Sequence, residues 1–269
     1  MINFSYVYKG LCAMSRAHRA NTMTGHLGAA LVAGYLFSED RSDLDPIVYR
    51  GIETELDRVI RGEEAIWYNA ADAGISIDEL FEPMPDEQPD PDLIPTIAAA
   101  LEPNIDRTRQ SGHNVIFAAL AIRALQSHPQ YATPSIVSGI VKLTEGFNNA
   151  GPGRGYYGAE RGWLGGYQVQ LPQEFTPPIY QDLQTMTSVM LDNLTAKAKE
   201  NTRGFGGLWH LINHCAALIE LDRLGYDQLA QKGLAAHHHH LRLWLTLPDV
   251  SDEFGPMIFS ERDSHRRYL

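Results

Sequence analysis

Three apolar segments of the chain each begin with glycine followed by histidine, and this recurrence constrains the fold more than any other feature. The segments are GHLGAALVAGYLF from Gly25, GHNVIFAALAIRAL from Gly112 and GLWHLINHCAALIELDRL from Gly207. A polar stretch precedes each one, and a second helical segment follows it after a short turn. Their histidines, His26, His113 and His210, are 87 and 97 residues apart. This spacing predicts three divergent internal repeats of roughly 90 residues each.

The repeated segments and the segments that follow them differ in polarity. His26–Phe37, Val115–Ile122 and Leu208–Ile219 are apolar on every side, so helices formed by them must be buried all round. In Ile47–Ile60 and Ser135–Phe147 the apolar residues instead recur at helical spacing on one face. Alternating buried and half-buried helices predict an all-α fold, an α/α toroid-like ring of helical hairpins. A layered open solenoid is the alternative.

Length, charge and cysteine content favour one soluble domain over residues 1–269. Apolar residues make up 44% of the chain and charged residues 20%, which excludes a disordered polypeptide. A net charge of −11 argues against nucleic acid and anionic membrane surfaces as partners. The apolar stretches are too short to span a bilayer, and the first residues do not resemble a signal peptide. Only Cys12 and Cys215 are present, which favours a reducing, cytoplasmic location.

Two irregular segments interrupt the helical pattern. Phe81–Asp92 is rich in proline and acidic residues and is typical of an exposed connector. Asn148–Pro172 is rich in glycine and aromatic residues, which is typical of a binding loop or lid, although a plain connector between the second and third repeats is the alternative. Within it, Tyr167–Leu171 has the best strand signal in the chain.

Four residues are candidates for substrate binding. Tyr156, Tyr157 and Arg161 belong to the glycine-rich segment, where an arginine beside aromatic rings can clamp an acidic or aromatic ligand. Trp209 directly precedes the third repeated histidine. For Arg161 the alternative is a surface ion pair or a loop anchor.

The histidines are the candidate catalytic and metal-binding residues. If the inner helices run parallel, their first turns meet at one mouth of a central cavity, and the rings of His26, His113 and His210 converge there. His214 lies one helical turn after His210, and such a pair can present two imidazoles to a divalent transition metal. Helix N-termini also favour neutral imidazole, which suits a metal ligand or a general base. The alternative is that each histidine only caps a nearby carbonyl group.

His237–His240 form a run of four histidines inside a predicted helix. Helical geometry allows only His237 and His240 to share a face. We expect most of the run to be partly exposed on an outer helix, with one ring reaching the cavity. Cys215 points away from its neighbour His214 and is expected to fill the core.

Several common catalytic motifs are absent from the sequence. There is no GxGxxG after a strand, no GxxxxGK[ST] and no GxSxG, which disfavours Rossmann enzymes, P-loop NTPases and α/β-hydrolases. The acidic clusters lie in turns, which argues against a terpene cyclase. Two cysteines are too few for a lanthionine-type zinc cyclase.

The region Gly112–Trp244 resembles the questin oxidase-like family. In both of its repeats a buried helix headed by glycine and histidine leads through a turn to a second helix, and His113, His210 and His214 match that pattern. The resemblance implies a helical oxidoreductase that inserts oxygen into an aromatic polyketide ketone, with NADPH as the electron source.

Together these features predict an enzyme, most simply an oxidoreductase, that acts on a small apolar molecule in a central helical cavity. The sequence does not determine the cofactor: a divalent transition metal is one candidate, and NADPH is the alternative that the resemblance implies. Two other functions fit the same residues: a non-catalytic module that binds a hydrophobic ligand or peptide, and a lyase or cyclase that uses histidine acid–base chemistry. The sequence does not determine the oligomeric state.

Overall fold

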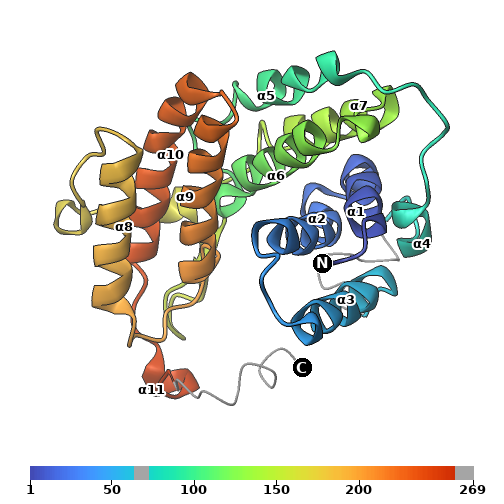
Figure 1. Ribbon diagram of the computed structural model, residues 1–269. Helices are drawn as coiled ribbons and strands as arrows, with labels where there is room; N and C mark the ends of the chain where they lie inside the picture. Colours follow the sequence, from blue (N-terminus) through green and yellow to red (C-terminus); the bar gives the residue numbers. More distant parts are fainter. Residues whose placement is uncertain (64–72, 258–269) are drawn as a thin grey trace.

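The computed structural model describes residues 1–63 and 73–257, and this part of the chain is mostly helical (Figure 1). The α-helices are α1 (Ser5–Arg16), α2 (Gly25–Asp40), α3 (Pro46–Ile60), α4 (Ile77–Phe81), α5 (Pro95–Leu101), α6 (His113–Ser127), α7 (Pro134–Glu145), α8 (Leu183–Lys197), α9 (Gly207–Arg223), α10 (Asp227–Leu245) and α11 (Ser251–Phe254). The all-α prediction is confirmed. None of the described helices is both long and apolar enough to cross a membrane.

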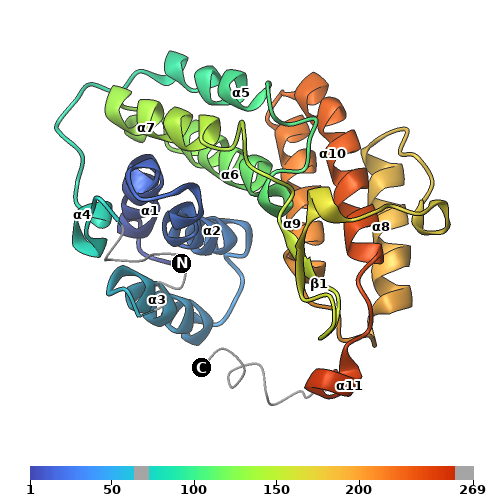
Figure 2. The same cartoon turned by 180° about the vertical axis from the view of Figure 1, so that it is seen from behind.

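The described residues contain one small sheet, and it lies earlier in the glycine-rich segment than predicted. Strands β1 (Arg154–Tyr156) and β2 (Trp163–Gly165) pair antiparallel, with Gly155 opposite Leu164. The predicted strand at Tyr167–Leu171 is wrong, because a short 3₁₀ turn at Gly166–Gln168 follows β2 directly. Figure 2 shows β1 beside α9 on the back of the molecule.

Helices α2, α6 and α9, which carry the three repeated histidines, occupy the middle of the molecule. α6 packs against α2 and α9, while α1 packs against α2 and α7, and α10 packs against α9. In Figure 1 the helices α1–α4 lie on one side and α8–α10 on the other, with α6 between them. The helices predicted to be amphipathic, α3 and α7, lie outside this middle row.

Glycines let the outer helices approach the inner ones closely. A Cβ atom at Gly28 of α2 would lie 2.5 Å from the carbonyl oxygen of Gly10 in α1. A Cβ atom at Gly139 of α7 would overlap the carbonyl of Ser15 at the end of α1. The α1–α2 and α1–α7 contacts therefore require glycine, which has no side chain, at these two positions.

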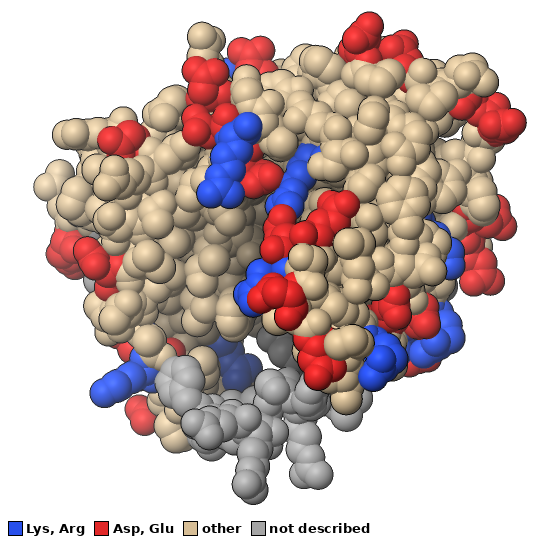
Figure 3. Space-filling view, in the orientation of Figure 1, with Lys and Arg blue, Asp and Glu red and all other residues tan. Residues whose placement is uncertain are grey.

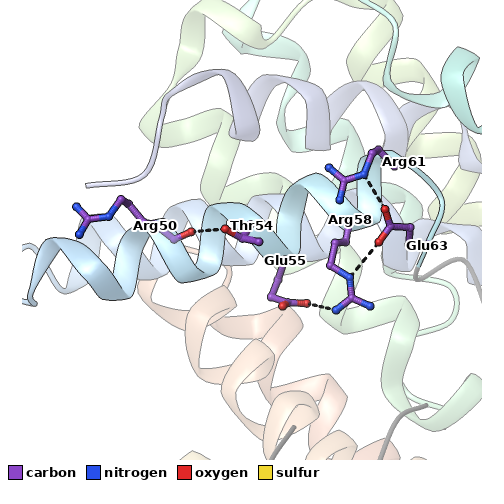
Figure 4. A network of polar contacts seen from close by, with 6 residues as sticks. All are labelled: Arg50, Thr54, Glu55, Arg58, Arg61 and Glu63. Atoms are coloured by element: carbon purple, nitrogen blue, oxygen red, sulfur yellow. Dashed lines mark hydrogen bonds and ion pairs between the residues drawn. The ribbon is translucent and has the colours of Figure 1, made fainter. Parts of the chain in front are cut away.

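The outer face of α3 carries a network of ion pairs (Figure 4). Arg58 contacts Glu55 at 2.9 Å and Glu63 at 3.1 Å, and Arg61 contacts Glu63 at 2.7 Å. These side chains are largely exposed, so the pairs contribute little to stability. The network belongs to the surface and has no part in the site described below.

The three middle helices are not buried on every side, so that prediction is wrong in one respect. On α9, Trp209 is 64% exposed, and Asn213 and Ala216 are exposed on the same stripe. On α2, Phe37 is 41% exposed, and Ala33 is exposed on the same side. Ala33, Asn213 and Ala216 line the groove described below, together with the half-buried Ile116 and Leu120 of α6. Trp209 and Phe37 are exposed outside that lining.

Candidate functional site

The structure brings His26, His113 and His210 together, as the repeat predicts. The Nε2 atom of His113 lies 2.7 Å from Nε2 of His26 and 3.1 Å from Nε2 of His210. One ring nitrogen from each residue falls within 4.8 Å of the others. The rings come from the first turns of α2, α6 and α9, so the convergence follows from three helices that begin at one point.

Each of the three rings donates a hydrogen bond from Nδ1 to a main-chain carbonyl at the start of its helix. The acceptors are Met23 for His26 at 2.8 Å, Gln110 for His113, and Gly206 for His210 at 2.7 Å. A carbonyl oxygen can only accept, so Nδ1 carries the hydrogen in all three rings. In the neutral form, every Nε2 atom then presents a lone pair to the others.

Three lone pairs in contact repel one another unless a cation lies among them. Zinc binds imidazole nitrogen at about 2.0–2.1 Å, so tetrahedral geometry separates two ligand nitrogens by about 3.3 Å. The two separations that involve His113, 2.7 and 3.1 Å, are shorter than that value, and all three nitrogens lie within 4.8 Å of one another. Metal-binding histidines also characteristically donate their other N–H to a carbonyl or carboxylate, which is the arrangement found here. The donor set therefore fits a divalent metal.

Burial keeps the three rings neutral. It lowers the pKa of His26 to about 4. It also lowers the pKa of His113, and the nearby rings of His26 and His210 lower it further. Burial lowers the pKa of His210 as well. At neutral pH all three residues are free of protons at Nε2 and available as ligands or bases.

The turns that lead into α6 and α9 contain backbone strain. Among the described residues other than glycine, positive φ angles occur at Gln110 (43°), Ser111 (58°) and Phe205 (46°). Gln110 supplies the carbonyl that holds His113, and Phe205 directly precedes the glycine that holds His210. Such strain costs about 1–3 kcal/mol per residue and concentrates at functional sites.

The glycine-rich segment supports both strained turns. The amide of Gln110 donates to the carbonyl of Gly151 at 2.7 Å, and the amide of Ser111 donates to Pro152 at 3.0 Å. The amide of Phe205 donates to the carbonyl of Arg154 at 2.7 Å. Residues 151–154 therefore link the starts of α6 and α9 through the main chain.

The predicted substrate-binding residues of this segment contact the end of α10 and α11. Tyr157 shares a 2.5 Å hydrogen bond with Thr246, and the guanidinium of Arg161 lies 5.1 Å from the centre of the Tyr157 ring. Tyr156 donates to Glu253 at 2.7 Å. None of these contacts joins them to the three histidines. Of the four candidates, only Trp209 is adjacent in sequence to one of the three histidines, His210.

His214 lies in a second histidine cluster, apart from the other three. Its ring centre is 5.2 Å from that of His237 and 5.6 Å from that of His240. His237 and His240 are fully buried on one face of α10, so the expected pairing of these two holds, but two rings are buried where one was expected. His238 and His239 are partly exposed, as expected. The apolar residues around the run, in LAAHHHHLRLWL, were the signal for this burial.

A groove of about 240 Å³ runs between α2, α6 and α9, the helices that carry the three histidines. It is lined mainly by small or apolar side chains: Ala33 of α2, Ile116, Ala119 and Leu120 of α6, and Ala216 and Ala217 of α9. Three polar residues, Arg123, Asn213 and Glu220, complete the lining. Arg123 contacts Asp40 at 2.5 Å and Glu220 at 3.4 Å, which joins α6 to α2 and α9. Figure 3 shows acidic and basic side chains gathered between the two sides of the molecule.

The groove begins one helical turn beyond the histidines. Ile116 and Asn213 follow His113 and His210 by three residues, and both line the groove. Arg123 and Glu220, which form an ion pair, are 97 residues apart, as are His113 and His210. Corresponding positions of α6 and α9 therefore face the three-histidine cluster and the groove.

No known family model, curated protein or solved structure matches this chain. The resemblance to the questin oxidase-like family is an expectation from the sequence alone.

Proposed function

We propose that this chain is a metalloenzyme in which His26, His113 and His210 bind one divalent transition metal. The substrate in this proposal is a small, largely apolar organic molecule that binds in the groove between α2, α6 and α9. The observation that carries the proposal is the meeting of three Nε2 lone pairs, each fixed by an Nδ1–H bond to a main-chain carbonyl.

Three neutral ligands leave at least one metal position for water or substrate, as in catalytic zinc sites. A metal held this way would polarise a carbonyl or lower the pKa of a bound water. The main-chain carbonyls hold the three rings in one tautomer. Within the described residues no carboxylate or thiol joins the three-histidine group, so the donor set consists of imidazole nitrogens.

The open apolar stripes on α2, α6 and α9 support an apolar substrate. Exposed apolar surface on helices that are otherwise buried marks a binding site. Ala33, Ala216 and Ala217 leave room for a ligand by their small size. The charged residues of the groove are already paired with one another, so they do not call for a charged substrate.

Metal titration tests the proposal. Chelator-treated protein should bind one equivalent of Zn²⁺ or Co²⁺, and His113→Ala should weaken this binding at least about 100-fold by removing the central ligand. His18→Ala is the matched control, because His18 also donates from Nδ1 to a carbonyl three residues earlier, Ser15 at 2.9 Å, outside the cluster. A wild-type chain that binds no metal, or equal binding by the His113→Ala chain, would contradict the proposal.

Oxidation is the reaction class that we propose, on the resemblance alone. Insertion of one oxygen atom from O₂ into a substrate requires two electrons and two protons, which convert the other atom to water. The groove fits NADPH poorly, because its arginine is already paired with two carboxylates. Oxygen uptake by the metal-loaded chain with aromatic ketones, with and without a soluble reductant, tests the reaction class.

A lyase or cyclase without metal is the second candidate function. The lowered pKa values of His26, His113 and His210 leave each ring able to accept a proton at neutral pH. This function predicts activity that survives complete removal of metal.

We also propose the finer architecture that the sequence predicts: three divergent repeats arranged in a toroid-like ring. The corresponding positions of α6 and α9 in the ligand site and the groove support it. A reducing, cytoplasmic location is supported by the two cysteines, Cys12 and Cys215, which are buried and unpaired.

A further inference from the structure

The second histidine cluster contacts both of the strained turns from which two metal ligands emerge. His214 and His240 are fully buried. His240 donates from Nε2 to the carbonyl of Phe205 at 2.8 Å. Phe205 has a positive φ of 46°, and the next carbonyl along the chain, that of Gly206, accepts the hydrogen bond from His210.

The same pair also lies against the turn before His113. Since Nε2 of His240 carries the hydrogen, its Nδ1 is an acceptor, and Nδ1 of His214 donates to it at 3.4 Å. The His214 ring in turn fills the space beside Gly112, where a Cβ atom would lie 2.6 Å from its Cγ. Gly112 has a φ of 88° and directly precedes His113.

We propose that His214 and His240 are positioning residues for the metal centre: together they fix the two turns that aim His113 and His210. This inference rests on the three-histidine metal site proposed above. Strained turns keep their geometry only where the surroundings over-determine it. Without the His240 donor, the Phe205 carbonyl loses its buried partner and the turn is free to relax. The Gly206 carbonyl then moves, and His210 loses its fixed tautomer and direction.

His237 provides a matched control on the same helix. It is also fully buried, and it also donates from Nε2 to a main-chain carbonyl, that of Leu211 at 3.1 Å. Leu211 lies inside α9 rather than in a strained turn. Replacement of His237 therefore removes the same kind of buried contact, and a ring whose centre is 5.2 Å from that of His214, without removing a hydrogen bond to either turn.

The test is Zn²⁺ affinity, measured by competition with a chromophoric chelator, together with the visible spectrum of the Co²⁺-loaded chain. His240→Leu should weaken Zn²⁺ binding about tenfold or more, the lower range for outer-shell partners of metal ligands. His240→Gln, whose amide keeps an N–H for the Phe205 carbonyl, should restore affinity to within about threefold of wild type. His237→Leu should change affinity less than about twofold and leave the Co²⁺ spectrum unaltered.

The outcomes separate the two proposals. A wild-type chain that takes up no metal overturns the metal centre itself. A wild-type chain that binds metal, with His240→Leu and His237→Leu equally affected, overturns only the positioning role. If His240→Leu does not fold, the comparison uses His240→Asn, which lacks a donor at the Nε2 position, against His240→Gln. Equal affinity of those two variants also overturns the positioning role.

Discussion

At the scale of single residues, the proposed metal centre depends on two glycines at the start of α9 that differ in what a side chain would contact. Gly206 and Gly207 are adjacent at the start of α9, with φ angles of 72° and 61°. A Cβ atom at Gly206 would overlap the His210 ring, whereas a Cβ atom at Gly207 would meet nothing within 4 Å. Both glycines have a positive φ angle that disfavours other residues, but only a side chain at Gly206 would contact the His210 ring.

We predict that Gly206→Ala and Gly207→Ala each lower the free energy of unfolding by about 1 kcal/mol, because alanine disfavours positive φ. Only Gly206→Ala should also weaken Zn²⁺ binding, by about tenfold, because it displaces the His210 ring. Denaturant unfolding and Zn²⁺ titration of both variants measure the two effects. Equal Zn²⁺ affinity of the two variants would be inconsistent with a metal held by His210.

The three histidines could be predicted from the sequence, but the groups that hold them could not. His26, His113 and His210 stand at similar places near the starts of three apolar segments, so helix direction alone predicts that they converge. Gln110, Ser111 and Phe205 adopt positive φ although residues of these types rarely do, and only tertiary contacts impose it. His214 was expected beside His210 on one face, but the ring packs under Gly112 instead.

At the scale of helices, the groove decides what α2, α6 and α9 can bind. Hydrophobicity on all sides predicted full burial, which holds for most of each helix. Sequence reasoning could not find the groove, because an apolar stripe that faces a ligand site reads the same as one that faces the core. The exposure of Ala33 and Ala216, which line the groove, marks the difference.

We predict that Ala216→Trp weakens binding of the neutral fluorophore N-phenyl-1-naphthylamine at least about tenfold, because the indole fills the groove. Ala216 is exposed, so the larger side chain should not disturb the core. Ala235→Trp is the control, at an exposed position of α10 outside the groove lining. Fluorescence titration measures both, and equal binding by the two variants would place the apolar ligand elsewhere.

At the scale of the whole molecule, helical periodicity was enough to predict an all-α fold. The pairing of β1 with β2 was missed because their residues, such as Gly155 and Gly165, carry no strand signal. Most of the four-histidine run was expected to be partly exposed. His237 and His240 of α10 instead lie in the core, so the interior contains neutral imidazole rings.

These buried imidazoles make stability depend on pH. Burial lowers the pKa of His237 to about 4 and that of His240 to about 3, whereas in the unfolded chain both values are near 6.5. The unfolded chain therefore binds more protons below pH 6.5, and acid favours unfolding.

We predict that the free energy of unfolding of the metal-free chain is level above about pH 6.5. It should fall toward pH 4, by up to about 1.4 kcal/mol per pH unit for each such histidine. Denaturant titrations across this range measure the slope. His237→Gln should make it shallower, and a free energy that stays constant between pH 7 and 5 would contradict the burial of neutral rings.

The most direct test of the metal centre is X-ray absorption spectroscopy of the zinc-loaded chain. We predict one zinc ion with three imidazole nitrogens at about 2.0–2.1 Å and a water oxygen in the fourth position. The imidazole signal should be lost in His113→Ala and kept in His18→Ala. Zinc bound through sulfur or carboxylate oxygen, or an imidazole signal unchanged in His113→Ala, would contradict it.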